Sequence, residues 1–102
     1  MYIYNITTNI EESVAEEWLK WMETIFIPKM LKNNKLKKAV LTKVLITEDM
    51  GGVTYSTQYF CDSAQELKDF IDNDLDSIKN QNQKFTGKFV DFSTQLKVIK
   101  EL

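Results

Sequence analysis

The sequence has 102 residues, 43% of them hydrophobic, which is enough for one domain with one apolar core and too little for two. Its 13 basic and 15 acidic residues give a formal net charge of -2, so no net positive field attracts nucleic acid, and we expect no nucleic-acid partner. There is no His and every basic residue is Lys, which excludes Ser-His-Asp and Cys-His nucleophile activation within one chain. We therefore predict a single domain over residues 1–102, and the missing residue types weigh against an enzyme.

The first elements are a strand and a helix. A strand is predicted over residues 2–8, where β-branched and aromatic residues mix with polar ones in a short run. A helix is predicted to begin at Ser13, because Ser13 and Glu16 have the spacing of a capping box. Pro28 disfavours helical geometry at the residue before it, so we expect a kink or break there and an end near Asn33. The apolar stripe that should face the core comprises Val14, Trp18, Trp21, Met22 and Ile25.

The remaining elements complete a known order. Two strands are predicted over residues 38–48 and 53–61, and the glycines within residues 48–52 favour a tight reversal between them. Ser63 and Glu66 form a second capping box, which predicts a second helix, and Gly87 marks a turn before a fourth strand over residues 88–100. The class is therefore α+β and the order is βαββαβ, that of the ferredoxin-like fold, with a four-stranded antiparallel sheet and two helices on one face.

Alternating side chains divide each predicted strand between a helix-covered face and an open face. In the fourth strand, the residues expected beneath the helices are Val90, Phe92, Leu96 and Val98. The opposite set, expected on the open face, is Phe89, Asp91, Ser93, Gln95, Lys97 and Ile99. The other strands are expected to add Ile3, Asn5, Thr7, Leu41, Lys43, Leu45, Ser56, Gln58 and Phe60 to the open face.

The open face predicts self-association. Four strands about 4.8 Å apart and roughly eight residues long give a face of roughly 500 Å² in projection, and parts of it are too apolar for water. Two such faces stacked about a two-fold axis would bury roughly 800 Å² per partner, a standard interface size. We therefore expect a homodimer through the open sheet face, with the architecture of a dimeric α/β barrel. The alternative is a monomer whose mixed face is hydrated.

Five sequence segments together resemble an uncharacterised bacterial family that is recorded as a domain of unknown function. They are MYIYN at residues 1–5, EEWLKWM at 16–22, the Ile27-Pro28 step, MGGVTYSTQY at 50–59 and GKFVDF at 87–92. The resemblance covers nearly the whole chain. It implies membership of the dimeric α/β-barrel (ferredoxin-like) superfamily, whose relatives include antibiotic-biosynthesis monooxygenases and haem-degrading enzymes.

The chain departs from the pattern of that family at three positions. The family pattern has a His where Phe26 stands, and basic residues that tend to be Arg are replaced here by Lys43 and Ser93. Any acid-base or anion-binding role at these positions is therefore not transferred to this chain.

Two groups of residues are candidates for a site. The aromatic residues Trp18, Trp21, Tyr55 and Tyr59 are candidates to line a cavity between sheet and helices, and the alternative is that they simply form a packed core. A polar group is expected to converge between the two sheets of a dimer, either as a ligand site or as groups that satisfy one another across the interface. This polar group comprises Asn5, Lys43, Ser56, Gln58, Asp91, Ser93 and Gln95.

Other features of the sequence concern metals, cofactors, membranes and the cellular location. No metal or cofactor is predicted, because the single Cys61 has no metal-ligand spacing around it and the chain has no His. A lone Cys suits a reducing cytoplasm. The N-terminus lacks the pattern of a secretory signal, and no run approaches the ~20 apolar residues that span a bilayer, so we expect a soluble cytoplasmic protein without a membrane partner.

Three classes of function remain after these exclusions. The first is a non-enzymatic homodimer that binds a small apolar molecule or a protein partner. The second is a cofactor-free enzyme of the monooxygenase type, in which the protein contributes desolvation and positioning. The third is a structural subunit of a larger assembly.

Overall fold

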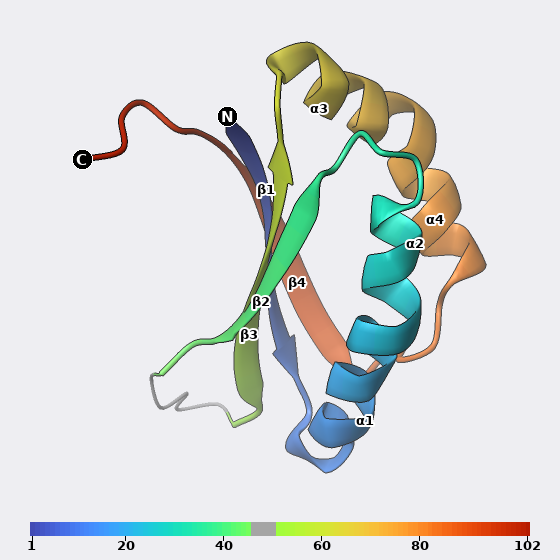
Figure 1. The fold of residues 1–102 in the computed structure, drawn as a ribbon. Coiled ribbons are helices and arrows are strands. Elements are labelled where there is room, and N and C mark those ends of the chain that lie inside the picture. Colours follow the sequence, from blue (N-terminus) through green and yellow to red (C-terminus); the bar gives the residue numbers. More distant parts are fainter. Residues whose placement is uncertain (46–50) are drawn as a thin grey trace.

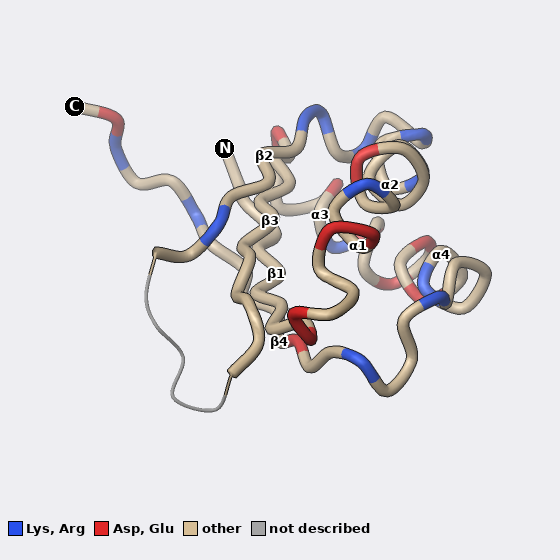
Figure 2. The backbone as a smooth tube through the Cα atoms, turned by 90° about the horizontal axis from the view of Figure 1, so that it is seen from below, with Lys and Arg blue, Asp and Glu red and all other residues tan. Residues whose placement is uncertain are grey.

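The computed structural model describes residues 1–45 and 51–102. Strands β1 (Tyr2–Ile10), β2 (Lys38–Lys43), β3 (Val53–Cys61) and β4 (Phe89–Lys97) form a sheet in the order β2-β3-β1-β4, and each neighbouring pair is antiparallel. The helices lie together on one side of this sheet, as Figures 1 and 2 show. The βαββαβ order and the one-sided layering predicted from the sequence are therefore confirmed.

The first helical segment begins differently from the prediction. It comprises a 3-10 turn (η1, Glu12–Val14), α1 (Ala15–Trp21), a π-helical turn (η2, Met22–Phe26) and α2 (Ile27–Leu31). No side chain caps either η1 or α1, so the capping box predicted at Ser13 is wrong. The backbone enters the segment through the 3-10 turn, and Ser13 lies within that turn rather than before it.

The π-helical turn changes which residues of this segment face the core. The Ile27 amide donates to the Met22 carbonyl, five residues back, immediately before Pro28, which has no amide to donate. The wider turn advances the buried face by one position, so that Phe26 is 8% exposed whereas the predicted stripe residue Ile25 is 43% exposed. The helical segment continues through Pro28 into α2 instead of breaking there.

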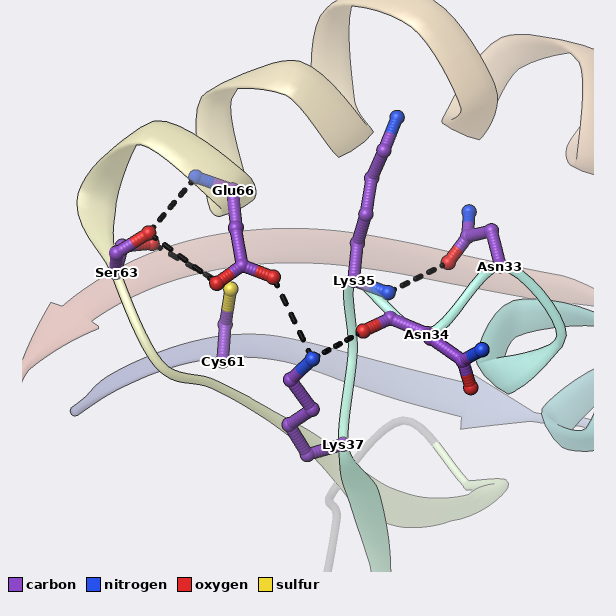
Figure 3. Close-up of polar contacts among 7 residues, drawn as sticks. All are labelled: Asn33, Asn34, Lys35, Lys37, Cys61, Ser63 and Glu66. Carbon is purple, nitrogen blue, oxygen red and sulfur yellow. Dashed lines mark hydrogen bonds and ion pairs between the residues drawn. The ribbon is translucent and has the colours of Figure 1, made fainter.

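The second helical segment starts where the sequence predicts. It comprises α3 (Ala64–Phe70), a π-helical turn (η3, Ile71–Leu75) and α4 (Asp76–Gln81). The Ser63 hydroxyl accepts a hydrogen bond from the Glu66 amide at 3.1 Å, which is the predicted N-cap. Figure 3 shows that the Glu66 carboxylate also faces the Lys37 ammonium, 3.5 Å away, so the start of α3 contacts the segment that leads into β2.

The strand pairings correct the predicted faces. Asp91 is paired with Thr8 and Ser93 with Ile6, and these β1 residues point toward the helices. The helix-side set of β4 is therefore Phe89, Asp91, Ser93, Gln95 and Lys97, the reverse of the prediction. Leu41 and Lys43 are paired with Thr57 and Tyr55, so they also lie on the helix side and not on the open face.

The opposite surface of the sheet, which we call the open face, has little charge. It consists of Ile3, Asn5, Thr7, Asn9, Lys38, Val40, Thr42, Thr54, Ser56, Gln58, Phe60, Val90, Phe92, Thr94 and Leu96. Within the described strands, Lys38 is its one charged residue, and Val90 and Phe92 are 71% and 64% exposed. Asn5 accepts from the Ser56 hydroxyl at 2.6 Å and donates to Thr7 at 3.2 Å, so part of its polar centre is already paired.

The predicted hairpin between β2 and β3 is described in part. Gly51 and Gly52 have φ values of 81° and 80°, as a tight reversal requires. Residues 46–50, which include the end of the predicted second strand and the start of the predicted turn, lie outside the described residues. Leu45, expected on the open face, lies just beyond β2 and is 89% exposed.

Candidate functional site

A cavity of about 420 Å³ lies between the first helical segment, the sheet and the segment that joins α4 to β4. Its apolar walls are formed largely by aromatic side chains. They comprise Ile6, Trp18, Trp21, Met22, Phe26, Phe85 and Phe89. Small-molecule sites in proteins typically occupy about 300–1,000 Å³ and are lined in this way, so both size and composition suit a ligand.

The first helical segment supplies the wall that faces the sheet. Trp18 packs against Tyr55 of β3 with ring centroids 5.1 Å apart, which fixes α1 over the sheet. Trp21 lies 5.2 Å from Phe26 across the π-helical turn. Because that turn rotates Phe26 inward, the local effect of Pro28 helps to shape the cavity wall.

The segment that joins α4 to β4 closes one side of the cavity. Figure 1 shows it returning from α4 past α1 into β4, and residues 82–87 all line the cavity. Phe85 is 6% exposed and meets Trp21 edge-on at 5.5 Å. The ion pairs Lys84–Glu17 at 3.5 Å and Lys88–Glu11 at 3.6 Å are largely exposed and contribute little. Burial of Phe85 and the hydrogen bond from the Glu11 amide to the Lys88 carbonyl, at 2.9 Å, therefore hold this segment.

Two hydroxyl groups on the sheet side of the cavity have no hydrogen-bond partner among the described residues. They belong to Thr8 of β1 and Thr57 of β3, which are 4% and 1% exposed and both line the cavity. Among the described residues, Tyr59 alone has a fully buried side-chain oxygen without a partner, so the Thr8 and Thr57 hydroxyls are not fully enclosed and can meet a molecule in the cavity. The cavity therefore contains hydrogen-bonding groups that the protein itself does not satisfy.

Asp91 provides the charge on the sheet side of this cavity. It lies directly opposite Thr8 on the edge strand β4, and it is exposed, which places it where the cavity meets solvent. Thr57 of β3 is paired with Ile6 and so lies diagonally from Thr8, and the three residues place polar groups on the sheet side of the cavity. Such an arrangement can orient a bound molecule by hydrogen bonds on one side.

The structure brings only some of the predicted site residues together. Of the aromatic candidates, Trp18 and Trp21 line the cavity, Tyr55 packs behind Trp18, and Tyr59 is buried elsewhere in the core. The polar candidates divide between the two surfaces of the sheet, so they do not converge as one group. Asn5, Ser56 and Gln58 lie on the open face, whereas Lys43, Asp91, Ser93 and Gln95 lie on the helix side. Of these, Asp91 lines the cavity.

Sequence reasoning missed several cavity residues. Thr8 shares the parity of Tyr4, Ile6 and Ile10, and this parity marks it as inward-facing. Phe85 stands in a polar stretch after α4, where no periodicity predicts its burial. Within the described residues, no group of three His, Cys, Asp or Glu side chains lies close enough to hold a metal ion.

The Tyr59 hydroxyl is a further group without a partner, and it lies outside the cavity. It is fully buried and has no hydrogen-bond partner within the described part of the chain. Burial, with a smaller contribution from Tyr4, raises the pKa of Tyr59 well above its ordinary value of 10.0. Above pH 10 the unfolded chain therefore releases this proton while the folded chain retains it, which lowers the stability of the folded state.

Replacing Tyr59 with Phe should leave stability at neutral pH unchanged or raise it by up to about 2 kcal/mol, because it removes an unpaired buried hydroxyl and keeps the ring. Above pH 10 the variant should lose stability less steeply than the wild type. Urea unfolding at pH 7 and at alkaline pH measures both effects. Tyr59→Leu, which also removes the ring, is the control and should be less stable. A clear loss of stability in Tyr59→Phe at pH 7 would show that the hydroxyl has a partner.

Comparison with solved structures identifies the fold. A dimeric ferredoxin-like protein from an uncultured marine organism is 16% identical, with 100% of this chain and 98% of that chain covered and a TM-score of 0.70. A protein from Arabidopsis thaliana is 11% identical, with 100% and 99% covered and a TM-score of 0.72. MhuD, a heme-degrader from Mycobacterium tuberculosis with two hemes bound in its active site, is 7% identical, with 100% and 99% covered and a TM-score of 0.68. At these identities the similarity defines the class of fold, which is ferredoxin-like.

Comparison of sequences identifies the family. A model described as a domain of unknown function, DUF4286, matches residues 1–99, so the chain belongs to the DUF4286 family. No curated protein matches the sequence. Among the described residues, no helix is long and apolar enough to cross a membrane.

Proposed function

We propose that this protein is a homodimer that binds a small, largely apolar molecule in the cavity beneath the first helical segment. The observation that supports the proposal best is that Thr8 and Thr57, whose hydroxyls have no partner among the described residues, both line an aromatic cavity. An aromatic wall provides hydrophobic binding energy, and the hydroxyls can form hydrogen bonds with the polar groups of a bound molecule. If a close-packed core filled this space, the two hydroxyls could not reach a bound molecule.

The homodimer is supported by the composition of the open face. Exposed apolar side chains of β4 lie beside an uncharged centre, and the similar ferredoxin-like protein from a marine organism is described as dimeric. A second copy stacked on this face would cover Val90 and Phe92 without burying more charge than Lys38 on each side.

We also propose a cytoplasmic location, because Cys61 is a buried free thiol.

The nature of the ligand is constrained by what the chain lacks. It contains no His, the residue that holds heme iron in many proteins. This favours an organic ligand without a metal. The alternative function, a cofactor-free enzyme of the monooxygenase type, would use Asp91 as its acid-base group, because Asp91 is the carboxylate that lines the described cavity.

Calorimetric titration with 2-naphthalenemethanol, a flat apolar alcohol, tests the binding site. The wild type should bind it, and Thr57→Val, which removes a hydroxyl with little change of shape, should bind it about threefold to tenfold more weakly, the effect of one hydrogen bond. Thr42→Val on the open face is the matched control and should bind normally. If the wild type does not bind, or if both variants weaken binding equally, the cavity is not the site.

A further inference from the structure

Among the described residues, the Asp91 carboxylate has no partner of opposite charge. The ion pairs among the described residues use Asp74, Glu66, Asp72, Glu17 and Glu11, and Asp91 takes part in none of them. No side-chain hydrogen bond of the described residues involves it either, and Thr8, directly opposite, has no partner. A carboxylate beside aromatic walls is thus left for a group that is not part of this chain.

The two lysines that line the cavity do not neutralise Asp91. The Lys84 ammonium lies 3.5 Å from the Glu17 carboxylate in an exposed ion pair, and no ion pair of the described residues joins it to Asp91. Lys79 lies in the last turn of α4, where a cation stabilises the negative end of the helix. Neither lysine is within ion-pairing distance of Asp91 in the described structure, so the sheet side of the cavity keeps its negative charge.

The chemistry of the walls complements this charge. An ionised carboxylate only accepts hydrogen bonds, so the group that meets Asp91 must be a donor. Aromatic rings such as those of Trp18, Trp21 and Phe89 attract cations through their negative faces. A neutral donor would gain only the hydrogen bond to Asp91. An ammonium group would gain this hydrogen bond and also the attraction of the aromatic rings. An anionic group at the same place would be repelled.

We propose that the ligand is an aromatic or otherwise apolar amine, held by its ring in the cavity and by its ammonium group at Asp91. This inference rests on the proposed function and names the class of ligand for the same cavity. Thr8 and Thr57 then lie beside the path of the ligand from Asp91 inward, where they pair with its remaining polar groups.

Three probes with one ring system test the proposal by isothermal titration calorimetry: 2-naphthylmethylamine, 2-naphthalenemethanol and 2-naphthoate. We expect the amine to bind about tenfold more tightly than the alcohol, and the acid to bind most weakly, because a charge-assisted hydrogen bond exceeds a neutral one by roughly this factor. In Asp91→Asn the amine should lose that advantage while the alcohol keeps its affinity. Added salt should weaken the binding of the amine and leave the affinity for the alcohol unchanged.

Asp62→Asn is the matched control, because Asp62 is exposed, does not line the cavity, and changes the net charge by the same amount. It should leave the order of the three probes intact. The proposal is overturned if the acid binds as tightly as the amine, or if the preference for the amine survives in Asp91→Asn. If none of the three probes binds the wild type, the proposed function itself fails, whereas binding of the alcohol without a preference for the amine refutes this inference alone.

Discussion

Replacing Phe92 with Lys should convert the proposed dimer to a monomer of 12.0 kDa. Phe92 lies on the open face of β4, opposite Thr7, and is 64% exposed in one chain. Stacking a second copy on this face would remove the ring from water, and a charged Lys in its place would have to be desolvated without a partner. Light scattering coupled to size-exclusion chromatography should give about twice 12.0 kDa for the wild type and 12.0 kDa for Phe92→Lys.

The neighbouring residue offers a control for this experiment. Ser93 follows Phe92 on the same exposed strand and points to the helix side, opposite Ile6. Ser93→Lys adds the same charge to the same edge strand and should remain a dimer. A wild-type protein that stays at 12.0 kDa at high concentration, or a Ser93→Lys variant that dissociates like Phe92→Lys, would show that the open face is not the interface.

The strands show why some predictions succeeded and others failed. β3 has the predicted bounds, residues 53–61, and its alternation is clear because it lies between two other strands and has one buried side. β4 is an edge strand that is exposed on both sides, and its more apolar side faces away from the helices. The assumption that the apolar side packs beneath the helices fails when the open face itself has to bury apolar side chains, as the proposed dimer requires.

The helices show a second limit of periodic reasoning. Trp18 and Met22 are buried as the stripe predicts, but the π-helical turn before Pro28 replaces Ile25 with Phe26 at the next buried position. The spacing of apolar residues assumes a constant 3.6 residues per turn, and one wider turn shifts all later positions. The capping box succeeded at Ser63 and failed at Ser13, because the backbone forms a 3-10 turn at Ser13.

Only part of the candidate site was predicted, because only some of its residues belong to periodic segments. Trp18 and Trp21 were identified because they belong to a periodic segment, whereas Phe85 comes from an irregular segment with no pattern to place it. Asp91 was named as a candidate but assigned to the wrong surface, since its position depends on the register with Thr8. Cavities form where distant segments fail to fill space, and this depends on tertiary packing that a single sequence does not encode locally.

Replacing Phe85 with Ala should destabilise the folded state by about 3 kcal/mol or more, the usual cost of removing a buried Phe side chain. Phe85 is 6% exposed and contributes an edge-on contact with Trp21 at 5.5 Å, which adds to the cost of its removal. Besides this residue, the segment between α4 and β4 has weak, exposed ion pairs and a backbone hydrogen bond at its end, from the Glu11 amide to the Lys88 carbonyl, so its middle should detach from the cavity first. Guanidinium unfolding at fixed protein concentration, followed by tryptophan fluorescence, measures the change.

Two variants test whether the effect comes from burial or from position. Phe89 lines the same cavity but is 39% exposed, so Phe89→Ala should cost clearly less than Phe85→Ala. Phe85→Leu restores most of the apolar volume without the aromatic edge, and it should recover most of the lost stability. Both tryptophans of the chain line the cavity, so their emission should shift toward that of exposed indole in Phe85→Ala before global unfolding begins. Equal costs for Phe85→Ala and Phe89→Ala, with unchanged emission in both, would mean that Phe85 does not hold the segment over the cavity.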